Sequence, residues 1–171
     1  MKRVLKWTGL GGLLMIGFLV VNAAQKGPNF EGTWTLDQSK SVVPEFMKGQ
    51  SITWVITQTE KQLARETKLG EGQGDHGGGN RPMVGSLRPT TLNLDGTETS
   101  IDTPRGKATS TAKLASGGKA LDVSTVLKGS EFSQTTAEHW ELSDDGKVLN
   151  VSQKRDTPQG VFETKLVFNK K

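Results

Sequence analysis

The stretch that decides the fold is FEGTWTLDQSKS, residues 30–41. In an extended strand, every second side chain points to the same side. One face of this stretch is formed by Phe30, Gly32, Trp34 and Leu36. Glycine lets a neighbouring ring or backbone pass closely, and tryptophan offers a large apolar surface. The stretch therefore predicts a strand in which Trp34, beside Gly32, plugs the end of a β-barrel.

The same alternation continues along the chain. ITWVIT at 52–57 places Ile52, Trp54 and Ile56 on one face, and similar patterns occur at 121–127 and 161–170. Period-two alternation is typical of strands with one buried and one solvated face. Ten strands are expected, near residues 32–37, 51–58, 62–69, 90–95, 97–102, 107–115, 119–127, 131–143, 147–156 and 161–169.

Short turns separate these strands. LDGT at 94–97 and DDGK at 144–147 contain Asp-Gly, a preferred pair for tight turns. No helical crossover of about 30 residues is evident, so neighbouring strands should pair antiparallel. We predict an all-β fold, an antiparallel up-and-down barrel of about 8–10 strands that removes exposed edges by closing. A two-sheet sandwich is the alternative.

Two segments interrupt the pattern. Residues 44–48 have room for one helical turn. The segment from Gly70 to Arg88 has seven glycines in 19 residues, a composition that disfavours one fixed conformation. It is expected either to be a mobile loop over one barrel end or to be a disordered insertion without a role.

The N-terminus has the composition of a targeting segment. Three basic residues precede an apolar run at 10–21, and VNAAQ at 21–25 supplies small residues for cleavage. We predict a signal peptide at 1–24, a single barrel domain at 25–171, and export to the periplasm or the extracellular space. An uncleaved N-terminal anchor is the alternative, although the apolar run is short for a membrane span.

Charge and cysteine content narrow the functional classes. The chain has 22 Lys and Arg against 18 Asp and Glu, and without the three basic residues of 1–24 this becomes 19 against 18. The charge therefore gives no indication of a nucleic-acid surface. The absence of cysteine excludes disulfides, thiol catalysis and cysteine-bound metal.

Two motifs resemble a known group of proteins. FxGTWxLDxxKS at 30–41 and WxLSDDGKxL at 140–149 resemble the openings and late motifs of exported bacterial lipocalin-like proteins, a group that largely lacks an assigned function. The Gly-Thr-Trp opening and the meander also resemble the calycins, that is, lipocalins and fatty-acid-binding proteins. This resemblance implies a barrel that binds a small apolar or amphipathic molecule. The paired cysteines of many lipocalins and the two-helix lid of fatty-acid-binding proteins are missing here.

Charged residues fall on the apolar faces of two expected strands. Arg65 shares a face with Leu63, and Glu138 shares one with Trp140. A buried charge without a partner costs several kcal/mol, roughly, so these groups should pair, bind water or await a ligand. By resemblance to fatty-acid-binding proteins, Arg65 would bind a ligand carboxylate. The alternatives are an internal Arg65–Glu138 pair, or a register slip that exposes Arg65.

The predicted ligand site therefore combines Arg65, Glu138, Trp54, Gln134 and Thr136. The small inward residues Ala108, Ser110 and Ala112 are expected to leave room for a ligand. We predict a binding module without a cofactor. The alternatives are a structural or interaction barrel filled by its own side chains and, less favoured, a barrel enzyme that uses Glu138 or Arg65.

Other chemistry has little support. Asp75 and His76 are adjacent in a glycine loop and lack further converging ligands, so no metal site is predicted. His139 falls opposite Trp140 and should be exposed, and no Ser-His-Asp arrangement is predicted. The scarcity of aromatic residues disfavours both an outer-membrane barrel and a nucleic-acid platform. No membrane span is expected once 1–24 is removed.

Overall fold

A computed structural model describes residues 27–70, 89–115 and 119–171 of the chain, and these form ten strands and one short 3₁₀ helix. The 3₁₀ helix is η1 (Glu45–Met47). The strands are β1 (Gly32–Leu36), β2 (Ile52–Gln58), β3 (Gln62–Leu69), β4 (Thr90–Asn93), β5 (Thr99–Thr103), β6 (Gly106–Leu114), β7 (Ala120–Lys128), β8 (Ser133–Leu142), β9 (Val148–Thr157) and β10 (Gly160–Lys170). All ten expected strands are present, with ends that differ by a few residues.

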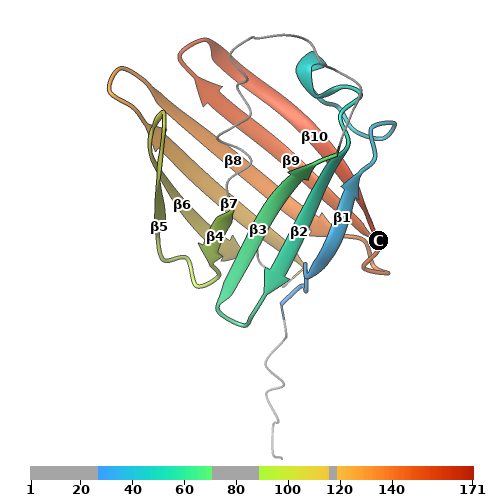
Figure 1. The fold of residues 1–171 in the computed structure, drawn as a ribbon. Coiled ribbons are helices and arrows are strands. Elements are labelled where there is room, and N and C mark those ends of the chain that lie inside the picture. Colours follow the sequence, from blue (N-terminus) through green and yellow to red (C-terminus); the bar gives the residue numbers. More distant parts are fainter. Residues whose placement is uncertain (1–26, 71–88, 116–118) are drawn as a thin grey trace, which may run out of the picture.

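The strands form one antiparallel sheet that curls into a nearly closed barrel (Figure 1). Their order is β4-β3-β2-β1-β10-β9-β8-β7-β6-β5, so consecutive strands pair, except for β4 and β5 at the two ends of the sheet, and β1 pairs with β10. Strand β4 lies against β6, and a single bridge joins Asp95 to Lys113. The predicted up-and-down barrel is confirmed, and the two-sheet sandwich is excluded.

The two Asp-Gly turns depend on glycines that adopt positive φ angles. Gly96 and Gly146, in the two Asp-Gly turns, have positive φ angles of 87° and 66°. Such angles are costly for other residues but open to glycine. The Gly146 turn joins β8 to β9, which pair antiparallel, whereas the Gly96 turn follows β4 and leads to β5, which pairs with β6 and not with β4.

The core is densest at one end of the barrel, which we call the Trp34 end: β1 begins there and β10 ends there. Trp34 is fully buried, and its indole N–H donates to the carbonyl of Phe30 at 2.8 Å. The ring of Trp54 packs 4.2 Å from Phe168 and 5.2 Å from Trp140, measured between centroids. Trp34 thus belongs to the buried core at this end, where a large ring contributes much apolar surface.

The small residues of β6 do not leave room for a ligand, contrary to expectation. The exposed fractions of Ala108, Ser110 and Ala112 are 9%, 7% and 1%. Ala112 belongs to the same buried cluster as Leu92 of β4 and Leu94 just after it. Since β4 lies against β6, the small side chains let these strands approach and help to close the barrel.

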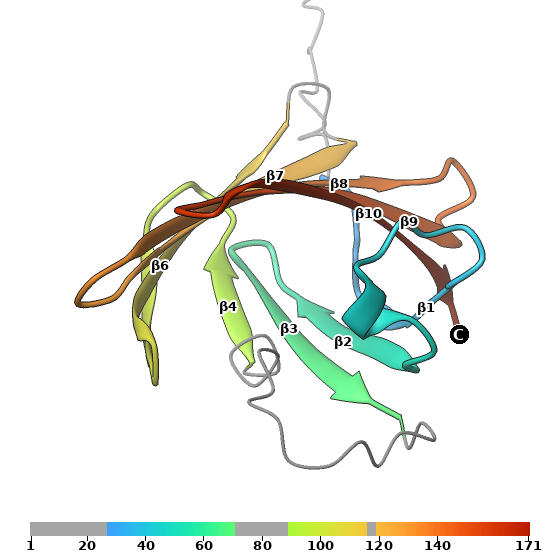
Figure 2. The ribbon, with the colours of Figure 1, turned by 90° about the horizontal axis from the view of Figure 1, so that it is seen from above.

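The segment between β1 and β2 contains the predicted helical turn, as η1. Val43, before the turn, and Met47, its last residue, pack against the core. Figure 2 shows η1 at the rim of the end opposite Trp34. We call this the Gly160 end, because β10 begins there.

Two predictions lie outside the described residues, namely the signal peptide at 1–24 and residues 71–88 of the glycine-rich loop. Within the described part of the chain, no helix is both long enough and apolar enough to span a membrane.

Candidate functional site

An ion pair joins two distant strands inside the barrel. The guanidinium Nη1 of Arg65 on β3 lies 3.2 Å from Oε2 of Glu138 on β8. The side chains are 16% and 10% exposed. Alternation alone indicated that both would face inward, and the structure shows the internal pair that was the alternative to a ligand contact.

The guanidinium of Arg65 also lies over aromatic rings. Its central carbon is 4.5 Å from the ring centroid of Trp54 and 5.3 Å from that of Trp140. A planar cation on an indole face is attracted by the ring quadrupole, most strongly where water is excluded. Arg65 is therefore held by a carboxylate and by two rings at once.

Glu138 accepts hydrogen bonds at both oxygens. Oε2 accepts from the indole N–H of Trp140 at 2.8 Å, and Oε1 accepts from the amide of Gln153 at 2.9 Å. With the Arg65 contact, three donors surround this carboxylate. Glu138 is therefore held in place by contacts to three different side chains.

Gln153 on β9 links this anion to a second cation. Its amide nitrogen donates to Glu138, while its carbonyl oxygen accepts from Nη2 of Arg155 at 3.3 Å and from Thr164 at 3.4 Å. The five residues joined in this way are the inner polar cluster: Arg65, Glu138, Gln153, Arg155 and Thr164.

Arg155 has no carboxylate partner among the described residues. Its Nη2 donates to Gln153, and its Nε is buried and has no hydrogen-bond partner over the described ranges. Because a guanidinium stays protonated, the cluster holds two cations and one anion. Arg155 is thus the one member of the cluster whose charge is not balanced within the described part of the chain.

The remaining predicted site residues lie around this cluster. Gln134 and Thr136 face inward on β8, both half-buried, with 3.5 Å between the Gln134 amide and the Thr136 hydroxyl. Trp54 is buried beside Arg65. The structure therefore brings all five predicted ligand-site residues into the barrel interior.

Sequence reasoning missed Gln153 and Arg155. The signal was present, because Leu149 and Val151 are buried on β9 and the same alternation continues to Gln153 and Arg155. Reading that face to the end of the strand would have identified both residues.

The barrel interior has two unlike halves. Toward the Trp34 end the inward side chains are apolar and buried. Toward the Gly160 end, β8 and β9 present Thr136, Gln134 and Arg155, which are half-exposed, and Phe162 on β10 is 53% exposed. Inward side chains that water reaches show that this half is not sealed. Figure 2 looks down on the strands at this end.

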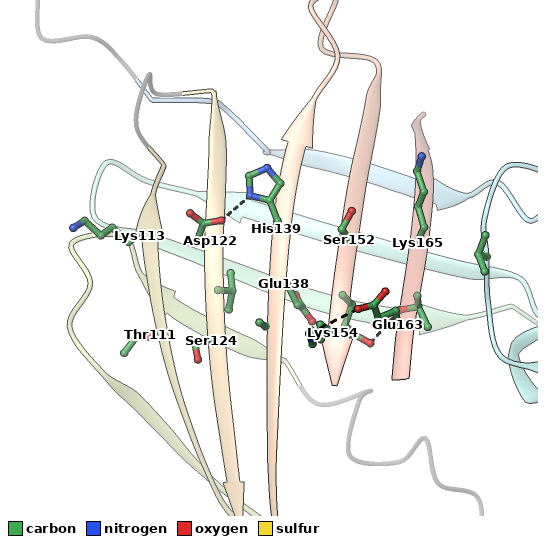
Figure 3. Close-up of a pocket in the computed structure, with 15 residues that line it drawn as sticks. Thr111, Lys113, Asp122, Ser124, Glu138, His139, Ser152, Lys154, Glu163 and Lys165 are labelled. Atoms are coloured by element: carbon green, nitrogen blue, oxygen red, sulfur yellow. Dashed lines mark hydrogen bonds and ion pairs between the residues drawn. The ribbon is translucent and has the colours of Figure 1, made fainter. Parts of the chain in front are cut away.

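A separate hollow of about 790 Å³ lies on the outer face of β6 to β10. Figure 3 shows a cross-strand row over it: Lys113, Asp122, His139, Ser152 and Lys165. These side chains alternate with the inward ones, so the hollow is not the barrel interior.

His139 is exposed, as predicted, and its Nδ1 lies 2.6 Å from Oδ1 of Asp122. Ser152 is the cross-strand neighbour of His139. Hydrolysis by a Ser-His-Asp arrangement would require, in addition, free hydrogen-bond donors that stabilise an oxyanion. The backbone of these central strands is instead engaged in the sheet ladders. Over the ranges that the structure describes, no group of three or more metal-ligating side chains occurs.

Comparison with known proteins shows likeness in fold only. No protein-family model matches the chain, and no curated protein matches it. Among solved structures, it is similar to one described as "REP1-NXSQ fatty acid transporter", with 15% identity over 82% of this chain and 95% of that one and a TM-score of 0.53. It is also similar to a secretory abundant heat soluble protein from Ramazzottius varieornatus, with 10% identity over 82% and 94% and a TM-score of 0.55.

A zebrafish ileal bile acid-binding protein, solved with cholic acid, aligns at 14% identity over 83% and 98% of the two chains with a TM-score of 0.48. The chain therefore shares its β-barrel fold with the fatty acid transporter and the heat soluble protein.

Proposed function

We propose that the protein binds a small apolar or amphipathic molecule inside the barrel, in the half toward the Gly160 end. The observation that supports this most directly is the partly buried inner polar cluster, which lies next to the packed aromatic rings of the core. Ligand sites typically combine apolar walls with a few convergent polar groups. Here Phe162 supplies exposed apolar surface, and Gln134 and Thr136 line one wall.

A structural neighbour described as a fatty acid transporter is consistent with this proposal but adds only the fold. The competing function is an interaction barrel without a ligand, which the buried cluster of Trp34, Trp54, Trp140, Phe30 and Phe168 favours. The two differ in whether the Gly160 half admits a foreign molecule.

A fluorescent probe for apolar sites tests the proposal, with a blocked variant and a matched control. Thr136 points inward and is half-buried, whereas Thr135 on the same strand is exposed. Thr136→Trp should fill the interior and abolish saturable uptake of the probe, while Thr135→Trp should leave it unchanged. Absence of uptake by the folded wild-type chain, or equal uptake by both variants, would overturn the proposal.

Export is the second part of the proposal. The basic and apolar composition of residues 1–24 supports a cleaved signal peptide and a periplasmic or extracellular location. The intact mass of protein recovered from its source tests cleavage. A mass that starts at Ala24 or Gln25 is expected, and a full-length chain retained with membranes would contradict it.

A further inference from the structure

We propose that the free edge of β10 pairs with the same edge of a second copy of this chain, so that two barrels share one continuous sheet across a two-fold axis at Phe162. This surface lies on the barrel wall and needs no ligand, so the inference goes beyond the proposed function.

The first half of β10 is a strand edge without a neighbour. On one side β9 pairs with β10 along nearly its whole length, whereas on the other side β1 pairs only with residues 168–170. Figure 1 shows β1 beside the C-terminal end of β10. Within the described ranges, the last contact on the β1 side is the bridge between Val42 and Lys165. Residues 160–164 therefore have β9 on one side and no described strand on the other.

The bridge to Val42 shows which backbone groups point to this free side. Lys165 exchanges both backbone hydrogen bonds with Val42, at 2.7 and 3.0 Å. Backbone groups alternate in direction along an antiparallel strand, so the N–H and C=O groups of Glu163 and Val161 point the same way. None of these groups has a hydrogen-bond partner over the residues that the structure describes. A row of free groups of this kind is a template for another strand.

Exposed apolar side chains are concentrated at the same edge. Val161 and Phe162 are 54% and 53% exposed, and Val42, where the free edge ends, is 64% exposed. In the described part of the chain, the other large apolar side chain that is exposed is Leu69. Strand edges are commonly protected by charged side chains, proline or a bulge, and here Glu163 is the one charged residue of the free edge. Pairing of the edge would shield apolar surface on both faces of β10.

The free backbone groups select one register for the second copy. With Val161 opposite Glu163 of the second copy, every free N–H and C=O group of both edges is paired. A shift that places Glu163 opposite Glu163 would bring two carboxylates together, which is unfavourable, and would need the backbone of Lys165, which Val42 already occupies. The opposite shift, with Val161 opposite Val161, would leave the groups of Glu163 unpaired.

The selected register makes the edge complementary to itself. Phe162 lies opposite Phe162 of the second copy in a non-hydrogen-bonded pair, in which the Cα atoms are about 4.5 Å apart. Aromatic side chains in such a position stabilise paired strands. The ends match as well, because the strand of the second copy begins at Gly160, opposite Thr164, and the next position, Lys165, is covered by Val42. These features commit the edge to a second copy, which forms a closed two-fold dimer.

Sedimentation velocity over a concentration series tests the association. The paired edge is short, so the dimer should be weak and should appear as the concentration rises. Glu163→Pro removes a free N–H that does not belong to the β9 ladder and should abolish the dimer, whereas Glu163→Gln keeps this N–H and should retain it. Phe162→Lys, which places like charges across the axis, should also abolish the dimer. Leu69→Lys, at an exposed apolar side chain elsewhere, is its matched control and should not.

Disulfide cross-linking tests the register. The chain has no cysteine, so a single introduced cysteine reports on one position. Phe162→Cys should yield a disulfide-linked dimer under mild oxidation, because directly opposite Cα atoms lie within the range that a disulfide spans. Thr164→Cys, on the same face of β10, should not, because it lies opposite Gly160 of the second copy and far from its own counterpart.

A wild-type chain that stays monomeric at every concentration would overturn the inference and would leave the edge to a strand of a different protein. Dimers that persist in both Glu163→Pro and Phe162→Lys would place the interface elsewhere and overturn it as well. The same holds for a disulfide that forms as readily in Thr164→Cys as in Phe162→Cys.

Discussion

Arg65 and Glu138, 73 residues apart in sequence, form an ion pair inside the barrel while Arg65 also lies over the ring of Trp54. The pair connects β3, which leads toward the open edge at β4, with β8 on the opposite wall. It therefore ties two parts of the barrel that share no ladder.

Removal of either partner should destabilise the fold. Arg65→Leu or Glu138→Leu leaves a largely buried charge alone and should lower the free energy of unfolding by about 3 kcal/mol. The double variant should lose clearly less than the two single losses combined. Urea denaturation of the four proteins measures this coupling.

The exposed pair of Lys154 and Glu163, 3.9 Å apart, is the matched control. Its coupling should not exceed about 0.5 kcal/mol, because water screens both charges. Equal coupling in the two pairs would show that the inner pair gains nothing from its enclosure.

Two glycines should differ in their tolerance of alanine. At Gly106 a Cβ would lie 2.0 Å from the carbonyl oxygen of Lys128, which the backbone cannot easily move. At Gly32 the nearest atom is Cε of Lys170 at 2.6 Å, on a flexible side chain that lies over Trp34. Both have φ angles that strain other residues, 133° and 139°.

Gly32→Ala should therefore cost about 1–3 kcal/mol from backbone strain, and Gly106→Ala should cost more. Thermal unfolding ranks the two. If Gly32→Ala is instead limited by contact, adding Lys170→Ala will restore its stability, and that rescue would contradict the strain explanation.

Replacement of Trp140 should lower the free energy of unfolding by more than the loss of buried volume alone would. Trp140→Phe removes the N–H that donates to Glu138 at 2.8 Å as well as part of a fully buried ring, and should cost about 2–4 kcal/mol. Trp54→Phe removes similar apolar surface without that hydrogen bond and should cost less. If chemical denaturation shows that the two variants lose equal free energy of unfolding, the hydrogen bond from Trp140 to Glu138 has no role in stability.

Acid should weaken the junction of β1 and β10. The Ser39 hydroxyl, the Asn169 amide and the Lys40 ammonium hold the pKa of Asp37 well below its ordinary value of 3.8. A lowered pKa in the folded state means that this contribution is complete above about pH 4 and is lost as the pH falls below it.

The test is the loss of urea stability between pH 7 and pH 3. It should be smaller in Asp37→Asn than in the wild type, because the variant has no proton to take up at this position. Glu31→Gln, at an exposed carboxylate just before β1, should lose as much as the wild type. An unchanged loss in Asp37→Asn would exclude Asp37 as a source of acid sensitivity.

The sequence was sufficient for the local structure. Period two placed Trp34, Trp54 and Trp140 on inward faces, and Asp-Gly pairs located turns at Gly96 and Gly146. Alternation is a property of one strand, so it needs no knowledge of neighbours. The same rule indicated that Arg65 and Glu138 face inward.

Which side chains contact each other across the barrel was decided by the tertiary structure alone. Closure of β1 onto β10 sets which strands face each other across the barrel, and side-chain contacts across it have no period in the sequence. That is why Arg65 pairs with Glu138 while Arg155, among the described residues, donates to Gln153, and why the small residues of β6 lie against β4. The sequence determined which face of its strand each residue occupies. The curvature of the nearly closed sheet decided which charged side chains meet across the barrel.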